Sequence, residues 1–126
     1  MVLWALQNAL GGELFVPKIP SYRITDLAEA IGPSCEKPIT GIRPGEKIHE
    51  EMITTSDSFT TIDLGAYYAI LPSDGRVQKL YRETGVSSTS VPKGFAYNSG
   101  SNTDFLSVEQ LRALIREHVD PTFEPV

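Results

Sequence analysis

The stretch GGELFVPKIPSYRITDLAEAIG, residues 11–32, decides how this chain begins to fold. Within it, ELFV at residues 13–16 predicts a short strand. PKIP at residues 17–20 predicts a loop, because two prolines this close cannot donate to a sheet ladder. DLAEAI, residues 26–31, then predicts a helix that Thr25 could cap and that a Gly-Pro pair would end. A strand, a loop and a helix therefore follow one another within one short stretch.

The residues before this stretch predict a short helix, which the glycine pair that follows it would terminate. Its apolar stripe consists of Val2, Leu3, Leu6 and Leu10, with Trp4 beside it. Because no Ser, Thr, Asp or Asn caps its start, we interpret Met1 as the edge of a fragment. We expect this helix to leave apolar surface exposed, so that the isolated chain self-associates or is poorly stable.

The residues after the stretch predict three more strands, at 37–42, 60–64 and 67–71, and a helical turn at the charged segment 49–52. Residues 72–104 have no clear pattern and are rich in Gly, Ser, Asn and Pro, which predicts a long loop that wraps another surface. The candidate anchors of that loop are Val77, Leu80, Tyr81, Phe95 and Tyr97.

A final helix is predicted after the capping box Ser107-Val-Glu-Gln110, and Asp120-Pro121 would end it. Its apolar stripe consists of Leu111, Leu114, Ile115 and Val119. We find no internal repeat and no linker that would divide the chain. The pattern therefore predicts one undivided α/β region, residues 1–126, with two or three short helices and several short strands.

Composition excludes several classes of partner. The formal net charge of −5 argues against a nucleic-acid binder, which would need clustered Lys and Arg. No apolar run reaches the roughly 18 residues that a membrane span requires, and the N-terminus lacks the features of a signal peptide. The single cysteine, Cys35, cannot form an internal disulfide and fits a reducing compartment.

Direct search excludes several catalytic motifs. The chain has no Gly-x-Gly-x-x-Gly, no Walker-type phosphate loop, no Gly-x-Ser-x-Gly elbow and no Tyr followed four residues later by Lys. His49-Glu50-Glu51 falls short of a zinc-protease motif, because Ile53 stands where the second histidine would be. We expect no metal site, and we interpret that segment as a solvated charged turn.

The tetrapeptide Arg43-Pro-Gly-Glu46 predicts a type II turn, since proline fixes its own φ and glycine permits a positive one. Such a turn could present Arg43 and Glu46 to the same side. The guanidinium could then grip a phosphate and the carboxylate could accept from ribose hydroxyls. An ordinary surface turn closed by an ion pair is the alternative, and four residues alone do not decide between them.

The chain resembles the C-terminal portion of the inverting UDP-N-acetylglucosamine 4,6-dehydratases in three stretches, GGELFVPKIPSYRITDLAEAIG, GIRPGEKIHEEMIT and YNSGSNTDFLSVEQLRALI. These enzymes belong to the extended short-chain dehydrogenase/reductase superfamily. Their complete chain is much longer, and its N-terminal Rossmann domain carries the NADP site and the catalytic residues. The resemblance therefore implies a small substrate-binding lobe, without a cofactor or catalytic residues of its own and inactive alone.

The resemblance also implies a reaction and a set of contacts. The family oxidises the sugar at C4 with NADP, eliminates water across C5 and C6, and returns hydride at C6 with inversion of C5. The product is a UDP-4-keto-6-deoxy sugar for pseudaminic acid on flagellins, for capsule or for O-antigen. By position in the family motif, Arg43 and Glu46 would hold the pyrophosphate and ribose of UDP-N-acetylglucosamine. Pro17 and Lys18 would lie near the sugar-nucleotide cleft, although a solvated surface lysine is an equal alternative for Lys18.

The expected partners are UDP-N-acetylglucosamine, the Rossmann domain of the parent lyase and further copies of the same chain in a homo-oligomer. The expected location is the cytoplasm. Two other interpretations remain open: a stand-alone module that captures nucleotide-sugars, and a piece that mainly mediates oligomer contacts. An upstream Gly-rich NADP site in the same reading frame would exclude the first, and UDP binding by the intact protein would exclude the second.

Overall fold

A computed structural model describes residues 1–126, which form two compact units. The first unit comprises Met1–Ile19 and Glu50–Ser101, and the second comprises Pro20–His49 and Asn102–Val126. The chain therefore passes between the units at three points, and each unit combines two separate segments of the sequence. For this reason the sequence pattern alone, which predicted one undivided region, does not reveal the division.

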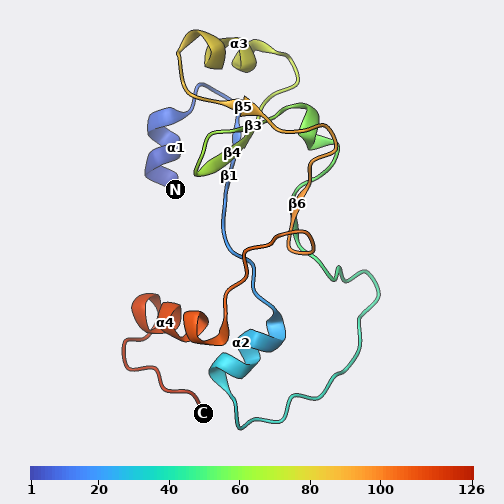
Figure 1. The fold of residues 1–126 in the computed structure, drawn as a ribbon, viewed down its shortest axis with the longest axis vertical. Helices are drawn as coiled ribbons and strands as arrows, with labels where there is room; N and C mark the ends of the chain where they lie inside the picture. The colour runs from blue at the N-terminus through green and yellow to red at the C-terminus, as the bar shows by residue number, and fades with distance from the viewer. The chain divides into compact units, whose positions relative to one another are not determined.

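The first unit is built on a four-stranded antiparallel sheet with the order β1-β4-β3-β5 (Figure 1). The strands are β1 Leu14–Pro17, β3 Thr61–Asp63, β4 Tyr67–Ile70 and β5 Thr89–Ser90. The predicted strands at 13–16, 60–64 and 67–71 are thus confirmed. Pro17 is tolerated at the end of β1 because this strand lies at the edge of the sheet.

Helix α1, Val2–Asn8, lies against this sheet through one aromatic residue. The indole of Trp4 stacks on Tyr67 with ring centroids 4.3 Å apart and meets Phe15 edge-on at 5.2 Å. The predicted helix is confirmed, and Val2, Leu3 and Leu6 of its apolar stripe are exposed, as expected. The large, flat indole anchors the helix in place of the aliphatic stripe.

The predicted long loop at 72–104 is wrong in part, because it contains helix α3, Arg76–Glu83. Val77 and Tyr81 point from α3 into the hydrophobic core, where they pack on Ile62, Ala69 and Leu71. Their spacing of four residues matches one helical face, but a two-residue signal amid polar residues is too weak to recognise in the sequence. Helix α3, one part of this segment, therefore contributes to the core of its own unit.

A second, two-stranded sheet joins β2, Glu51–Ile53, to β6, Tyr97–Asn98. The predicted helical turn at 49–52 is therefore wrong. Ile53 is 0% exposed, and burying it on a strand outweighs the helix preference of the charged residues before it. A short 3₁₀ turn, η1 at Asp57–Phe59, connects this sheet to the larger one.

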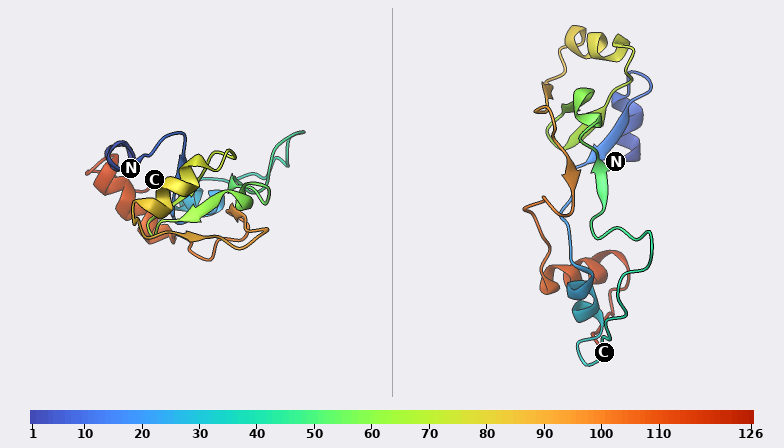
Figure 2. Two further views of the ribbon diagram at one scale, coloured as in Figure 1. Left: turned by 90° about the horizontal axis from the view of Figure 1, so that it is seen from above. Right: turned by 90° about the vertical axis from the view of Figure 1, so that its right-hand side faces the viewer.

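The second unit pairs helix α2, Ile24–Ile31, with helix α4, Val108–His118 (Figures 1 and 2). The capping box is confirmed, since the hydroxyl of Ser107 accepts from the Gln110 N–H and the Gln110 side chain accepts from the Ser107 N–H. Thr25 is not the cap of α2, because the helix starts two residues earlier than predicted, at Ile24, with Arg23 at its N-cap. Arg112 of α4 donates to the carbonyls of Glu29 and Ala30 and so satisfies the C-terminal end of α2.

Residues 33–49, here called the arm, leave the end of α2 as one open loop (Figure 1). The arm has no helix or strand, and every residue in it is exposed. The predicted strand at 37–42 is therefore wrong, because no partner strand pairs with it and Ile39 stays 98% exposed. None of the helices in the whole chain has the length and apolar composition needed to span a bilayer.

Candidate functional site

Lys18 and Pro17, two of the four predicted site residues, lie at the edge of the larger sheet. Pro17 ends β1 opposite Tyr67, and the Lys18 N–H continues the pairing by donating to the Ala66 carbonyl at 3.2 Å. The ammonium Nζ of Lys18 lies 2.7 and 2.8 Å from the two carboxylate oxygens of Asp63. It also lies 4.5 Å from the centre of the Tyr68 ring. Lys18 is therefore held by a charge and by an aromatic face.

Asp63 is the counter-ion that the sequence did not identify. It ends β3 and its Oδ1 also accepts from the Gly65 N–H at 2.8 Å, which fixes the turn between β3 and β4. Partial burial raises the pKa of Asp63, but the donors Lys18 and Gly65 outweigh burial and hold this pKa below its ordinary value. The carboxylate is thus ionised and paired at neutral pH.

Tyr68, whose ring contacts Lys18, belongs to a cluster of three aromatic rings. Tyr68 of β4 packs on Phe95 at 5.1 Å and on Tyr97 at 5.4 Å between ring centroids. The Tyr97 hydroxyl donates to the Ile19 carbonyl at 2.7 Å and accepts from the Ile19 N–H at 2.9 Å. One phenol therefore fixes the backbone directly after Lys18. Burial raises the pKa of the Tyr68 phenol, and the nearby Asp63 and Tyr97 add to this rise while Lys18 opposes it.

Arg43 and Glu46 form the predicted turn in the arm of the second unit. Gly45 has φ +85°, and the Glu46 N–H donates to the Arg43 carbonyl at 3.1 Å. The carboxylate oxygen Oε2 of Glu46 accepts from the backbone N–H of Arg43 at 2.8 Å. Glu46 therefore closes the turn through the backbone, and no ion pair joins the two side chains. The predicted turn is therefore present, but the ion pair that would close an ordinary surface turn is absent.

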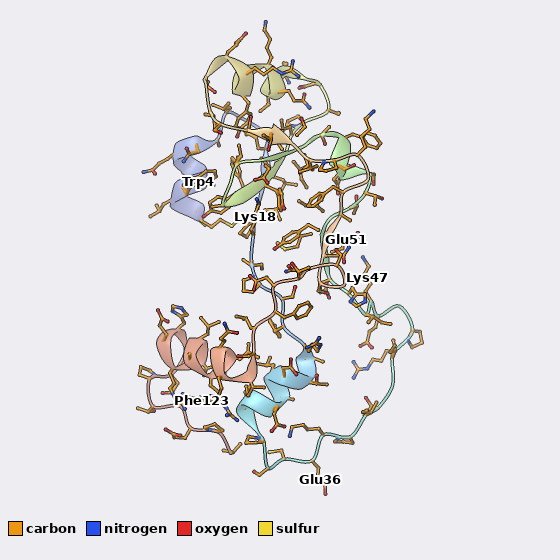
Figure 3. The ribbon with its side chains drawn as sticks, in the orientation of Figure 1. Trp4, Lys18, Glu36, Lys47, Glu51 and Phe123 are labelled. Atoms are coloured by element: carbon orange, nitrogen blue, oxygen red, sulfur yellow. The ribbon has the colours of Figure 1, made fainter.

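The Arg43 guanidinium is consequently exposed and lacks a carboxylate partner. Lys47, one residue beyond the turn, is likewise exposed, and Figure 3 shows it on the same arm as Glu36, which projects outward. A fixed turn that presents an unpaired guanidinium can accept an anion such as a phosphate bidentately. Of the four predicted residues, Pro17 and Lys18 belong to the first unit, and Arg43 and Glu46 belong to the second.

The residues that sequence reasoning missed are those that hold Lys18. Asp63 lies within the strand predicted at 60–64 and is the last residue of β3, and Tyr97 was predicted only as an apolar anchor. Neither carries a local signal for its role, because Asp63 meets Lys18 across 45 positions and Tyr97 meets Ile19 across 78. No cluster of three or more His, Cys, Asp or Glu side chains that could hold a metal ion is found.

Comparison with known proteins gives the family. The profile of the family described as "Polysaccharide biosynthesis protein" matches residues 1–72, more than half of the chain. The chain belongs to this family. The matched residues include both candidate sites, Pro17 with Lys18 and Arg43 with Glu46, as well as the counter-ion Asp63.

Two relatives refine this result. A UDP-N-acetylglucosamine 4,6-dehydratase (inverting) from Campylobacter jejuni is 42% identical over 118 residues, which cover 90% of this chain and 35% of that enzyme. A UDP-glucose 4-epimerase from Rickettsia felis is 33% identical over 91% of this chain and 34% of its own length. The resemblance to the inverting dehydratases is therefore confirmed. The chain spans about a third of the length of these relatives.

A solved structure supports the fold. The X-ray structure of Pen from Bacillus thuringiensis matches with a TM-score of 0.69 and 27% identity, over 91% of this chain and 34% of that one. The α/β class predicted from the sequence is confirmed. The polysaccharide biosynthesis family member described here thus has a fold similar to that of a solved protein over 91% of its length.

Proposed function

We propose that this chain is the nucleotide-sugar-binding region of a longer UDP-N-acetylglucosamine 4,6-dehydratase of the inverting type. The observation that carries the proposal is the unpaired guanidinium of Arg43 on a turn closed by Glu46. The identity of 42% to a Campylobacter jejuni dehydratase supports this choice of substrate. The longer enzyme would make a UDP-4-keto-6-deoxy sugar for polysaccharide, pseudaminic acid or flagellin glycosylation.

Each residue of the turn has a distinct role in this proposal. The planar guanidinium of Arg43 holds the pyrophosphate of UDP through two parallel hydrogen bonds. Glu46 uses Oε2 to close the turn, which leaves Oε1 to accept from a ribose hydroxyl. Binding then costs little reorganisation, because the turn is already formed and the guanidinium exchanges only water for phosphate.

Pro17 and Lys18 have a secondary role. Lys18 is neutralised by Asp63, so it contacts the ligand only by sharing its ammonium between the carboxylate and a ligand oxygen. The ammonium has three donors and the Asp63 carboxylate occupies at most two of them. Pro17 fixes the backbone from which Lys18 extends.

The rest of the longer protein would complete the reaction. NADP, held by its Rossmann domain, would accept the hydride from C4 and return it at C6. The residues described here bind and orient the nucleotide, so that the sugar reaches that cofactor. We expect the complete enzyme to be a cytoplasmic homo-oligomer and this chain alone to bind no NADP.

Titration of UDP into the chain, and kinetics of the longer enzyme, test the proposal. Arg43→Ala should weaken UDP about ten- to a hundred-fold, the loss of a charge-assisted contact. Arg43→Lys should recover only part of this, because an ammonium cannot present a planar fork. In the longer enzyme the loss should be mainly in KM, because the pyrophosphate is remote from the reacting carbons.

Lys47→Ala is the matched control, because Lys47 is exposed on the same arm but lies outside the turn. It should change UDP affinity less than about three-fold, since it contributes only a screened long-range attraction. Equal losses in Lys47→Ala and Arg43→Ala would mean that the arm attracts UDP only by its charge. No loss in Arg43→Ala would leave the tetrapeptide as a surface turn without a ligand.

The similarity to a UDP-glucose 4-epimerase makes epimerisation a second candidate reaction. Both reactions use a UDP-sugar, so UDP binding does not separate them. Incubation of the longer enzyme with UDP-N-acetylglucosamine does, because dehydration removes one water from the sugar and epimerisation leaves its mass unchanged. A product lighter by one water supports the dehydratase, and a product of equal mass supports the epimerase.

A further inference from the structure

The first unit contains a groove that the proposed function does not use. It lies between η1 and β3 on one side and α3 on the other, and its volume is about 330 Å³. The side chains that matter for its chemistry are Phe59, Thr61, Gln78, Lys79, Arg82 and Ser90. Neither Arg43 nor Lys18 contributes to it. The volume lies at the lower end of the range of about 300–1,000 Å³ for small-molecule sites.

Two cations on one face of α3 give the groove a positive charge. Lys79 and Arg82 are three residues apart on the helix, and both line the groove. Arg82 forms no ion pair, and Lys79 has only a long contact of 3.7 Å with Glu83, in which both side chains are mostly exposed. Such an exposed pair contributes little, so a ligand can displace it easily.

Apart from Glu83, which makes the long contact with Lys79, the carboxylates next to the groove are engaged elsewhere. Asp74 holds Arg76 at 2.6 Å, on the same helix but outside the groove. Asp57 accepts from the N–H of Thr54 at 2.9 Å and from its hydroxyl at 2.6 Å. In a chain with a net charge of −5, a groove lined by two available cations and no available carboxylate stands out.

An exposed aromatic ring lies on the opposite wall. Phe59 of η1 is 70% exposed, although a phenyl ring of this size gains by burial. Ser90 and Gln78 add a hydroxyl and an amide that can donate hydrogen bonds. The groove thus combines a flat apolar surface, two cations and neutral donors.

We propose that this groove binds a small phosphate monoester that carries a planar ring. The phosphate lies between Lys79 and Arg82, where the guanidinium can contact two oxygens in parallel. The ring packs on Phe59 and covers it from water. Nucleoside monophosphates and aryl phosphates share this chemistry, and the site is independent of the UDP site at Arg43.

Binding of phenyl phosphate to the 126-residue chain, followed by isothermal titration calorimetry or by NMR shifts, tests the proposal. Phenyl phosphate should bind more tightly than inorganic phosphate, and phenol should not bind measurably, because the site needs both the ring and the charge. The double variant K79Q/R82Q should lose affinity about ten-fold or more, since it removes both charge-assisted contacts. Higher salt should weaken the wild type more than this variant.

The variant F59A tests the ring separately. It should weaken phenyl phosphate about three- to ten-fold but leave inorganic phosphate unchanged, because only the first ligand stacks. R76Q is the matched control, since Arg76 lies on the same helix but is paired with Asp74 outside the groove. These positions are exposed, so the variants should remain folded by circular dichroism.

Three results would overturn the proposal: no binding of phenyl phosphate by the wild type, equal losses in R76Q and K79Q/R82Q, or equal affinity of F59A and wild type for phenyl phosphate. The first would show that the groove is only a surface depression. The second would show a nonspecific response to net charge, and the third would remove the ring from the ligand class. None of them affects the UDP site, because Arg43 is unchanged in all these variants.

Discussion

Lys18 and Arg43 were both predicted to contact one ligand, yet the structure gives them opposite surroundings. Lys18 lies at a sheet edge, where Asp63 and the Tyr68 ring already hold its charge. Arg43 lies on an open arm, where no carboxylate reaches its guanidinium. An anion must compete with Asp63 for the first, but displaces only water from the second. Sequence motifs identify cations, whereas availability depends on what the fold places beside them.

The backbones around these two residues differ in the same way. The sheet that contains β1 packs on a core that includes Leu71 and Tyr81, whereas every residue of the arm is exposed. We therefore expect changes in the sheet to affect folding and changes in the arm to affect ligand binding alone. Comparing one residue of the folded sheets with one residue of the arm tests this difference.

The largest difference is expected between two isoleucines. Ile53 is 0% exposed on β2, and Ile39 is 98% exposed on the arm. Ile53→Ala should lower the free energy of unfolding by about 2–5 kcal/mol, because it removes buried methyl groups and leaves a cavity. Ile39→Ala should change it by less than about 0.5 kcal/mol. Urea unfolding followed by tryptophan fluorescence measures both, and similar effects would mean that the arm is packed.

Two glutamates provide the next comparison, because each accepts from backbone N–H groups. Glu13 accepts from the N–H of Leu10 at 2.6 Å and of Gly11 at 2.7 Å, and so ties the end of α1 to β1. Glu46 accepts from the N–H of Arg43 on the arm. Glu13→Gln should lower the free energy of unfolding by about 1–2 kcal/mol, and Glu46→Gln by less than about 0.5 kcal/mol.

Acid titration tests the role of Glu13 in the wild type. Partial burial raises the pKa of Glu13, but the N–H donors outweigh burial, so its pKa is lower in the folded than in the unfolded chain. Its contribution to stability is therefore present above the unfolded pKa and is lost as the pH falls through the folded one. Glu13→Gln should reduce the acid sensitivity of unfolding. An unchanged acid profile would contradict the assigned role of Glu13.

The sequence predicted the regular parts of this fold because their signals are local. The capping box of α4 and the hairpin of β3 and β4 each depend on a few adjacent residues. Pro17, in contrast, was predicted as part of a loop but ends β1. Helix α3 and strand β2 were missed because burial of Tyr81 and Ile53 decides them, and burial depends on distant residues. The arm was assigned a strand because its residues have strand propensity, but propensity without a partner strand does not form a sheet.

The candidate sites show the same limit. The turn at Arg43 was predictable, since its proline and glycine determine the backbone, and Gly45 has the expected positive φ. The pairing of Lys18 with Asp63 was not, because it joins the residue after β1 to the last residue of β3, 45 positions away. The groove at α3 could not be anticipated either, since the helix that carries Lys79 and Arg82 was itself interpreted as a loop.

Alkaline pH should lower the stability of the first unit through ionisation of Tyr81, which is 4% exposed. Burial, together with the Glu13 carboxylate, raises the pKa of Tyr81 to about 12. In the unfolded chain the Tyr81 phenol loses its proton at about pH 10. The contribution of Tyr81 to stability is therefore complete below that pH and is lost as the pH rises toward the folded pKa. We expect a loss of about 1 kcal/mol at pH 11. Tyr81→Phe should flatten this dependence, whereas Tyr22→Phe, at an exposed position, should not.

The smallest expected effect decides whether Lys18 is bound mainly by its own protein. The Lys18–Asp63 pair is partly exposed, so a double-mutant cycle of Lys18→Met and Asp63→Asn should give a coupling free energy of about 0.2–1 kcal/mol. Asp63→Asn alone should raise the affinity for UDP if Lys18 reaches the ligand, because it frees the ammonium. It should leave the affinity unchanged if Lys18 only holds the sheet edge.

In Arg43→Ala no carboxylate is released, so the unfolding free energy should stay within about 0.5 kcal/mol of the wild type while UDP affinity falls. A coupling free energy near zero between Lys18 and Asp63, with UDP affinity equally sensitive to Lys18 and Arg43, would contradict this. It would show that the neighbouring groups do not determine which cation is available to the ligand.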